Sequence, residues 1–127
     1  MLQKLFFIVQ KRAKSLTFLW TLLVFYLCLM PQRKIAHIPI FGIDKLVHVL
    51  FFGIFMFLLL FIMKPNKWMV SFLIATLFGC LIEGLQYYFT SLGRSGDWKD
   101  IVADALGAII FGYLHYILSN TYKNKQA

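Results

Sequence analysis

Residues 46–63 read LVHVLFFGIFMFLLLFIM, a run of 18 residues without a lysine, arginine, aspartate or glutamate. A run of this length and apolarity can cross the hydrocarbon core of a bilayer as a helix. The rest of the chain supports this interpretation, because 61% of its residues are hydrophobic and only 14% are charged. An ordinary soluble domain has about 25% charged residues. The sequence therefore predicts an integral membrane protein.

Three further apolar runs predict three more membrane-spanning helices: Ser15–Met30, Trp68–Phe89 and Ile101–Leu118. The first of these is short, because its residues rise only ~24 Å as a helix against a hydrocarbon core of ~30 Å. Proline, glycine and lysine residues separate the runs, as they do at helix ends. We therefore expect an all-α fold, a bundle of four transmembrane helices with no internal repeat.

The predicted organisation is a basic N-terminal segment (residues 1–14), a four-helix domain (15–118) and a short basic tail (119–127). The N-terminal segment mixes basic and apolar residues, so it forms either an amphipathic helix on the membrane surface or a disordered arm. Large residues near Cys28 argue against cleavage of a signal peptide, and we expect the first helix to be retained. Cys28 and Cys80 lie within apolar runs and are expected to be buried thiols without a disulfide.

The charge of the chain fits a membrane surface better than a nucleic acid. The net charge is +8, but the basic residues flank the apolar runs, where they orient helices and contact anionic lipids. With four spans, eight of the 13 lysines and arginines fall on the side of the termini and five on the other. The positive-inside rule therefore predicts a multi-pass plasma (inner) membrane protein with both termini in the cytoplasm.

All five acidic residues of the chain fall at one and the same membrane face in this topology, away from the cytoplasm. Glu83 and Asp104 lie inside predicted spans, where a carboxylate costs several kcal/mol unless it is paired or solvated. We therefore predict a polar ligand-binding pocket at this face. Its candidate residues are Asp44, Lys45, His48, Glu83, Gln86, Arg94, Asp97, Asp100 and Asp104.

Some of these residues have simpler explanations. Asp44 precedes the second span and is expected to act as an N-cap, and His48, one turn later, could be an ordinary interfacial residue. Asp97 and Asp100 resemble a cap and an acidic first turn, which the helix dipole favours. Capping does not explain the fifth carboxylate, Asp104, which lies about two turns inside the fourth span.

Glu83 and Asp104 have a structural alternative, in which one of them forms an ion pair with Arg94. A ligand site is the preferred hypothesis, because one ion pair does not need five carboxylates and a histidine on one face. Gly79 and Gly107 permit close helix contact and are expected to pack the third span against the fourth. The residues expected to meet in a single cluster are His48, Glu83, Gln86, Arg94 and Asp104.

Three ordered motifs carry a resemblance to a known family. They are DKLVH at 44–48 followed by FFG at 51–53, EGLQY at 83–87, and RSGDWKD at 94–100 running into DALG at 104–107. In this order and spacing the chain resembles the VanZ-like family of small polytopic membrane proteins, over about residues 31–118. One departure is Asp104, where the family more often has asparagine. The founding member is associated with teicoplanin resistance, so the resemblance implies an envelope protein with a possible link to glycopeptide resistance.

Two classes of function remain open at this stage, and the sequence leaves open whether the protein is an enzyme. In the first, the pocket binds a lipid or a cell-wall precursor. In the second, its carboxylates and histidine hold a metal ion for hydrolysis or transfer of a lipid headgroup; oxygen ligands suit Mg²⁺, Ca²⁺ or Mn²⁺, and His48 would admit Zn²⁺. A proton-coupled transporter is a third possibility. No sequence motif assigns a cofactor or a catalytic residue, and the expected partners are membrane lipids rather than nucleic acid.

Overall fold

The computed structural model of the chain describes residues 1–31, 42–89, 91, 93 and 96–124. Within these ranges the chain forms four α-helices and a short 3-10 helix, with no strand. In chain order they are α1 (Leu2–Cys28), α2 (Ile43–Met63), η2 (Pro65–Lys67), α3 (Trp68–Tyr88) and α4 (Trp98–Asn124). The expected all-α helical bundle is confirmed.

Three stretches of the described chain are long and apolar enough to cross a membrane: Ile43–Met63, Pro65–Tyr88 and Trp98–Tyr122. They account for α2, α3 and most of α4. The helix α1 is not among them, and it carries Lys11, Arg12 and Lys14 along its length. It also begins much earlier than its apolar run, at Leu2, so the basic N-terminal segment is helical and continuous with the first apolar run.

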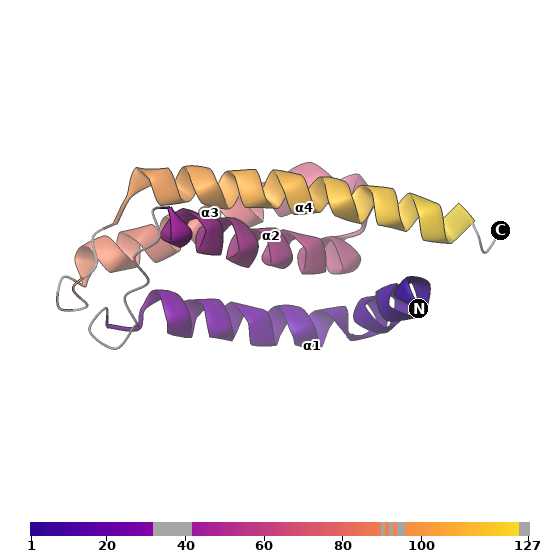
Figure 1. Cartoon of the computed structure of the whole chain (residues 1–127), viewed down its shortest axis with the longest axis horizontal. Coiled ribbons are helices and arrows are strands. Elements are labelled where there is room, and N and C mark those ends of the chain that lie inside the picture. Colours follow the sequence, from indigo (N-terminus) through magenta and orange to yellow (C-terminus); the bar gives the residue numbers. More distant parts are fainter. Residues whose placement is uncertain (32–41, 90, 92, 94–95, 125–127) are drawn as a thin grey trace.

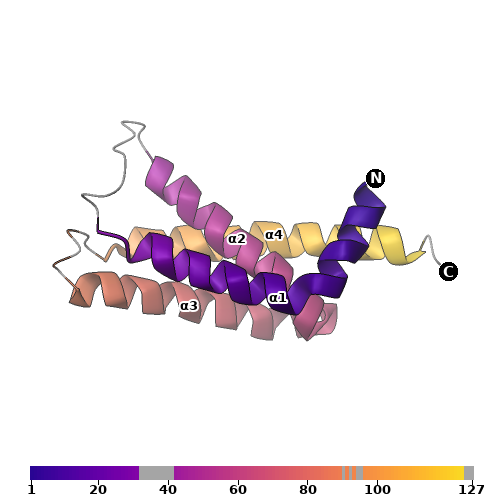
Figure 2. The same cartoon turned by 90° about the horizontal axis from the view of Figure 1, so that it is seen from below.

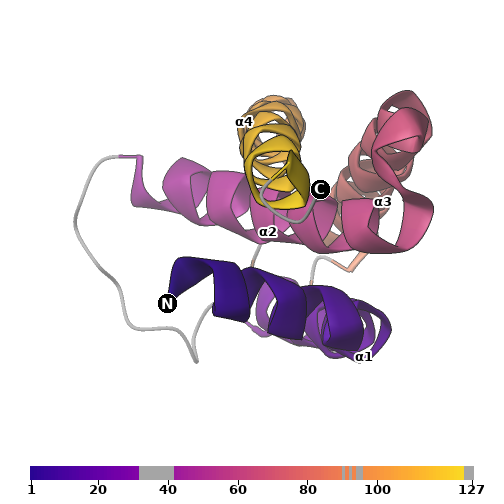
Figure 3. The same ribbon diagram turned by 90° about the vertical axis from the view of Figure 1, so that its right-hand side faces the viewer.

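Successive helices alternate in direction, so the two chain ends lie at the same end of the bundle (Figure 1), and α2 crosses the other helices obliquely (Figure 2). The helix α2 lies between α1 and α4 (Figures 1 and 3) and packs against all three other α-helices. The first turns of α1 bend away from the direction of the rest of that helix (Figure 2). The starts of α2 and α4 and the end of α3 therefore come together at the end of the bundle opposite the termini.

The core is apolar and rich in aromatic rings. On α2, one side presents Phe52, Met56 and Leu60, each at most 1% exposed. Their partners come from the three other helices: Val24 and Cys28 from α1, Ala75, Phe78 and Ile82 from α3, and Ala108 from α4. Many large apolar side chains cover the outside of the bundle, where a membrane protein contacts lipid rather than water.

The two cysteines differ in their surroundings. Cys28 is buried in the core, as expected, whereas Cys80 is exposed on the outside of α3. The expectation of a buried thiol at Cys80 is therefore wrong. The reason is the helical period: Gly79 faces inward toward α4, and the next residue is turned about 100° away from it.

Candidate functional site

A group of ionisable side chains occupies the end of the bundle where α2 and α4 begin and α3 ends. We call it the acidic cluster and define it as Asp44, Lys45 and His48 of α2, Glu83 of α3, and Asp97, Asp100 and Asp104 at the start of α4. Four of its members, His48, Glu83, Asp100 and Asp104, are buried. The chain thus places seven of the nine candidate residues in one group.

His48 is the centre of the buried part of the cluster. Its ring Nδ1 lies 2.8 Å from Oδ1 of Asp104, at hydrogen-bonding distance. Its Nε2 lies 3.9 Å from Oε1 of Glu83 and 3.9 Å from Oδ2 of Asp100. A carboxylate can only accept a hydrogen bond, so Asp104 makes Nδ1 the donor and leaves Nε2 directed at the other two carboxylates.

Glu83 connects α3 to the start of α4. Its Oε2 accepts a hydrogen bond of 2.8 Å from the backbone N–H of Asp97, just before the first residue of α4. Its other oxygen, Oε1, is buried and has no hydrogen-bond partner in the described part of the chain. One half of this carboxylate therefore holds the helix start in place, and the other half is available to a ligand.

Lys45 closes the cluster on its more exposed side. Its Nζ lies 2.9 Å from Asp44, 3.0 Å from Asp97 and 2.5 Å from Asp100. The three N–H bonds of the ammonium group thus face three carboxylates. At Asp97, a hydrogen bond from the backbone N–H of Lys99 and the nearby Lys45 ammonium hold the pKa of the carboxyl below its usual range.

Local sequence explains how the start of α4 is built. Asp97 Oδ1 accepts a hydrogen bond of 2.9 Å from the N–H of Lys99, two residues later, which is the pattern of an N-cap. Asp100 lies in the first turn of the same helix. Both roles agree with the prediction from spacing, although Asp100 is also buried against Lys45 and His48.

Asp44 does not cap α2, so that expectation is wrong. The helix begins at Ile43 with Gly42 as its N-cap, and Asp44 lies inside the first turn. Gly42 adopts φ of 78°, a left-handed conformation that glycine adopts without strain, and with Gly42 as N-cap the helix begins two residues earlier than it would with Asp44 as N-cap. The Asp44 side chain instead pairs with Lys45 at the exposed rim of the cluster.

Two glycines set the distances between the helices. A Cβ on Gly79 would collide with the Asp104 carboxylate, so the absence of a side chain there lets Asp104 lie against α3. A Cβ on Gly107 would collide with the backbone of Val49. Gly107 therefore packs α4 against α2, which corrects the expectation that it faces the third span; only Gly79 lies between α3 and α4.

Gln86 and Arg94 are the two candidates outside this group. The Gln86 amide donates a hydrogen bond of 2.7 Å to the backbone oxygen of Cys28, so it connects α3 to the end of α1 rather than to the cluster. Arg94 lies outside the described residues, and so does any ion pair it makes with Glu83 or Asp104.

The sequence analysis placed His48 and Asp104 in one expected cluster, but it did not predict their direct hydrogen bond, and its structural alternative paired the buried carboxylates with Arg94 instead. The two residues are 56 positions apart, and only the packing of α2 on α4 brings them together. One signal was present: Gly107 lies three residues after Asp104 and marks a place where α4 lies close to the backbone of another helix. The glycine alone does not indicate which helix α4 contacts there.

The described cluster contains groups that can bind a cation. Five carboxylates surround the ammonium of Lys45 and the imidazole of His48. Carboxylate oxygens and an imidazole nitrogen are groups that bind amines or metal ions, and carboxylates repel anions.

Comparison with known proteins gives one match. The family model described as VanZ/LLP1 matches residues 3–120 of the 127-residue chain. No curated protein and no solved structure matches the chain. The matched range includes every residue of the acidic cluster.

Proposed function

This chain belongs to the VanZ/LLP1 (VanZ-like) family, and from that premise we propose that it is an envelope membrane protein whose acidic cluster binds the positively charged group of a lipid or cell-wall ligand. The family match and the three apolar helices make it a membrane protein. The ligand and its site are the proposal.

One observation carries this proposal: three buried carboxylate oxygens of the cluster have no hydrogen-bond partner among the described residues. Oδ1 of Asp100 is ion-paired with Lys45, which leaves Oε1 of Glu83 and Oδ2 of Asp104. A buried polar atom without a partner is costly, by about 1–3 kcal/mol and more for a charged group. A cluster that served only to hold helices together would satisfy its oxygens internally. Buried carboxylate oxygens that have no donor within the described chain are instead what a ligand with hydrogen-bond donors requires.

The charge of the cluster favours an amine as the donor group. Lys45 already shows how an ammonium is held there, because it contacts three carboxylates at once. Primary amines occur in lipid headgroups and in lysine-containing cell-wall precursors, and both are at hand at the surface of a cell membrane. The amine is the shared chemistry, and the experiment below separates the two sources.

The location of the cluster follows from the distribution of basic residues. In a four-span topology, eight of the 13 lysines and arginines fall on the side of the termini and of the connection between the second and third spans, and five fall on the other side. The positive-inside rule then supports cytoplasmic termini and an acidic cluster on the outer side. The burial of Val24 and Cys28 of α1 in the common core supports α1 as a fourth membrane crossing.

The test uses the protein in lipid nanodiscs, with Glu83→Gln as the variant. Glutamine keeps an oxygen that can accept the hydrogen bond from the Asp97 N–H, but it replaces the ligand-facing oxygen with a donor and removes the charge. Wild-type protein is expected to retain phosphatidylethanolamine over phosphatidylglycerol in native mass spectrometry. In the variant, the ratio of retained phosphatidylethanolamine to phosphatidylglycerol should fall at least about tenfold, because one hydrogen bond to a charged group contributes about 1.5–3 kcal/mol.

His115→Gln is the matched control, because His115 is a buried polar residue of α4 about 16 Å along the helix from Asp104. It should keep the lipid preference. A second arm replaces the lipid with a soluble lysine-containing stem peptide, and binding of the peptide alone would assign the amine to the cell wall. Equal binding of both probes by wild type and Glu83→Gln would contradict the proposal, as would loss of folding in Glu83→Gln alone.

The link to glycopeptide resistance is tested separately in cells. If the cluster is responsible, expression of the wild type should raise the teicoplanin concentration that inhibits growth, and Glu83→Gln at the same protein level should not. An unchanged inhibitory concentration with the wild type would remove the resistance role and leave the binding proposal to the nanodisc experiment.

A further inference from the structure

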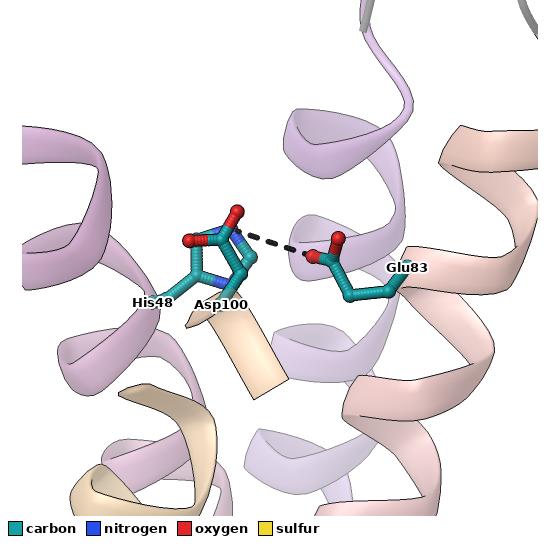
Figure 4. A group of neighbouring side chains, drawn as sticks. All are labelled: His48, Glu83 and Asp100. Carbon is teal, nitrogen blue, oxygen red and sulfur yellow. Dashed lines mark ion pairs between the residues drawn. The ribbon is translucent and has the colours of Figure 1, made fainter. Parts of the chain in front are cut away.

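We infer that His48, Glu83 and Asp100 form a binding site for a divalent transition-metal ion. Each residue offers one ligand atom, and the three atoms lie within 4.8 Å of one another. All three residues are buried and come from three different helices, α2, α3 and α4. Figure 4 shows the Glu83 carboxyl group extending from α3 toward the His48 ring and Asp100.

The orientation of His48 is the first argument for a metal. Metal-binding histidines usually donate their second ring N–H to a carboxylate, which fixes the tautomer and the plane of the ring. Here Asp104 takes that role: its Oδ1 lies 2.8 Å from Nδ1, and the side chain is fully buried. The lone pair of Nε2 is thereby directed at the space between Glu83 and Asp100. Asp104 is thus a positioning residue rather than a ligand.

The second argument is independent of the acidity of the cluster. The Glu83 side chain is 5% exposed, its Oε1 has no hydrogen-bond partner in the described chain, and this atom lies 3.9 Å from Nε2 of His48. At 3.9 Å the ring nitrogen makes no hydrogen bond to this oxygen, so the Oε1 acceptor stays unsatisfied. A metal ion between Nε2 and Oε1 would satisfy both atoms.

The distances fit a metal after small side-chain movements. In a tetrahedral site with bonds of about 2.1 Å, ligand atoms are about 3.4 Å apart. The two separations of 3.9 Å from Nε2 of His48 are about 0.5 Å wider than this, and the third, between Glu83 and Asp100, is within 4.8 Å. Rotation of the two carboxylates about their terminal bonds can close that difference without moving a helix.

The ligand set selects the kind of metal. One imidazole nitrogen with two carboxylate oxygens suits Zn²⁺ or Mn²⁺, because Ca²⁺ takes six to eight oxygens and Mg²⁺ prefers to keep its waters. Three protein ligands leave at least one position for water or for an oxygen of the ligand. This inference rests on the proposed function in treating the cluster as a cation site, and it names the inorganic cation that the buried part would hold.

The test measures Mn²⁺ binding to the full-length protein in nanodiscs of phosphatidylcholine, which has no primary amine. Electron paramagnetic resonance should show one tightly bound Mn²⁺ per chain, and pulsed measurements should detect coupling to one imidazole ¹⁴N. Addition of Zn²⁺ should displace the ion. These measurements use the wild type, so they decide the question even if a variant fails to fold.

Three variants then locate the ion. His48→Gln, Glu83→Gln and Asp100→Asn should each weaken Mn²⁺ binding at least tenfold, and His48→Gln should abolish the ¹⁴N coupling. His115→Gln removes a different buried histidine and should retain both the affinity and the coupling. Asp104→Ala should weaken binding about 10–100-fold, the usual effect of removing the carboxylate behind a ligating histidine, and Asp104→Asn should restore most of it.

Absence of bound Mn²⁺ and Zn²⁺ in the wild type, or ¹⁴N coupling that survives in His48→Gln, would overturn the metal site. The lipid-retention experiment is run with a chelator present, so its outcome does not depend on the metal. Retention of phosphatidylethanolamine without metal binding would overturn only this inference. Metal binding without any lipid or peptide preference would overturn only the amine ligand of the proposed function.

Discussion

Gly107→Ala should separate α4 from α2 and thereby weaken both the fold and the acidic cluster. The added Cβ would lie 2.8 Å from the carbonyl carbon and 2.9 Å from Cα of Val49, and closest of all to the Val49 oxygen. All three atoms are backbone, so no side-chain rotation relieves the contact. Ordinary contacts of this kind are 3.4–4 Å, so the two helices must move apart by about 1 Å at this point.

The energetic cost follows from this geometry. Overpacking a well-packed core costs about 1–3 kcal/mol, and a contact with rigid backbone belongs at the upper end. A loss of about 3 kcal/mol is on the order of a 100-fold change in the ratio of folded to unfolded protein. Gly107 lies one turn from Asp104, so the same displacement should lengthen the hydrogen bond between Asp104 and His48.

Gly84→Ala is the matched control. Gly84 also lies within a membrane-embedded helix, but a Cβ there meets nothing within 4 Å. Alanine at this site should be neutral or stabilise the helix by up to about 1 kcal/mol. Unfolding in mixed micelles, followed by circular dichroism, gives the free energy for each variant. Equal stability of the two variants would refute the close contact between α2 and α4, and with it the position assigned to the cluster.

Three further predictions concern the cluster, a strained residue and the topology. Asp104→Asn keeps an oxygen that accepts a hydrogen bond from His48, so it should change the free energy of unfolding by less than about 1 kcal/mol. Asp104→Ala should lower the free energy of unfolding by about 2 kcal/mol or more. Equal losses for the two variants in the same unfolding assay would contradict the hydrogen bond. Lys64 has φ of 70°, so Lys64→Gly should stabilise the protein by about 1 kcal/mol in thermal unfolding, and a loss would show that this backbone conformation is absent. Single cysteines at Ser91 and Asn66 in a cysteine-free background should react with an impermeant reagent in intact cells at Ser91 alone; reaction at Asn66 alone would reverse the orientation.

The fold was largely predictable because hydropathy and helix breakers act over short distances. The run at 46–63 became α2 almost unchanged, and Asp97 became the cap that its spacing to α4 indicated. The start of α1 was not predicted. Basic residues are mixed with the apolar ones before residue 15, so hydropathy did not indicate that the helix begins at Leu2. Local pattern also failed at Asp44, because the left-handed conformation of Gly42 sets the helix start.

The membership of the cluster was harder to predict than its location. The depth of Glu83 and Asp104 along their helices was readable from the sequence, and this placed both carboxylates near one end of the bundle. Their partners depend on how each helix is rotated about its axis. That rotation directs Asp104 to His48 and Gln86 to the end of α1, and it is set by contacts such as Gly107 on Val49 that join distant parts of the chain.

The convergence of α2, α3 and α4 on one buried histidine is the central claim, and solid-state NMR in lipid bilayers tests it most directly. With ¹⁵N in the His48 ring and ¹³C in the aspartate carboxyl groups, the hydrogen bond of 2.8 Å between Nδ1 and Asp104 Oδ1 places the carboxyl carbon about 3.6 Å from that nitrogen. A strong dipolar coupling that disappears in Asp104→Asn prepared without asparagine labelling is the expected result. A coupling that corresponds to more than about 6 Å would contradict the claim.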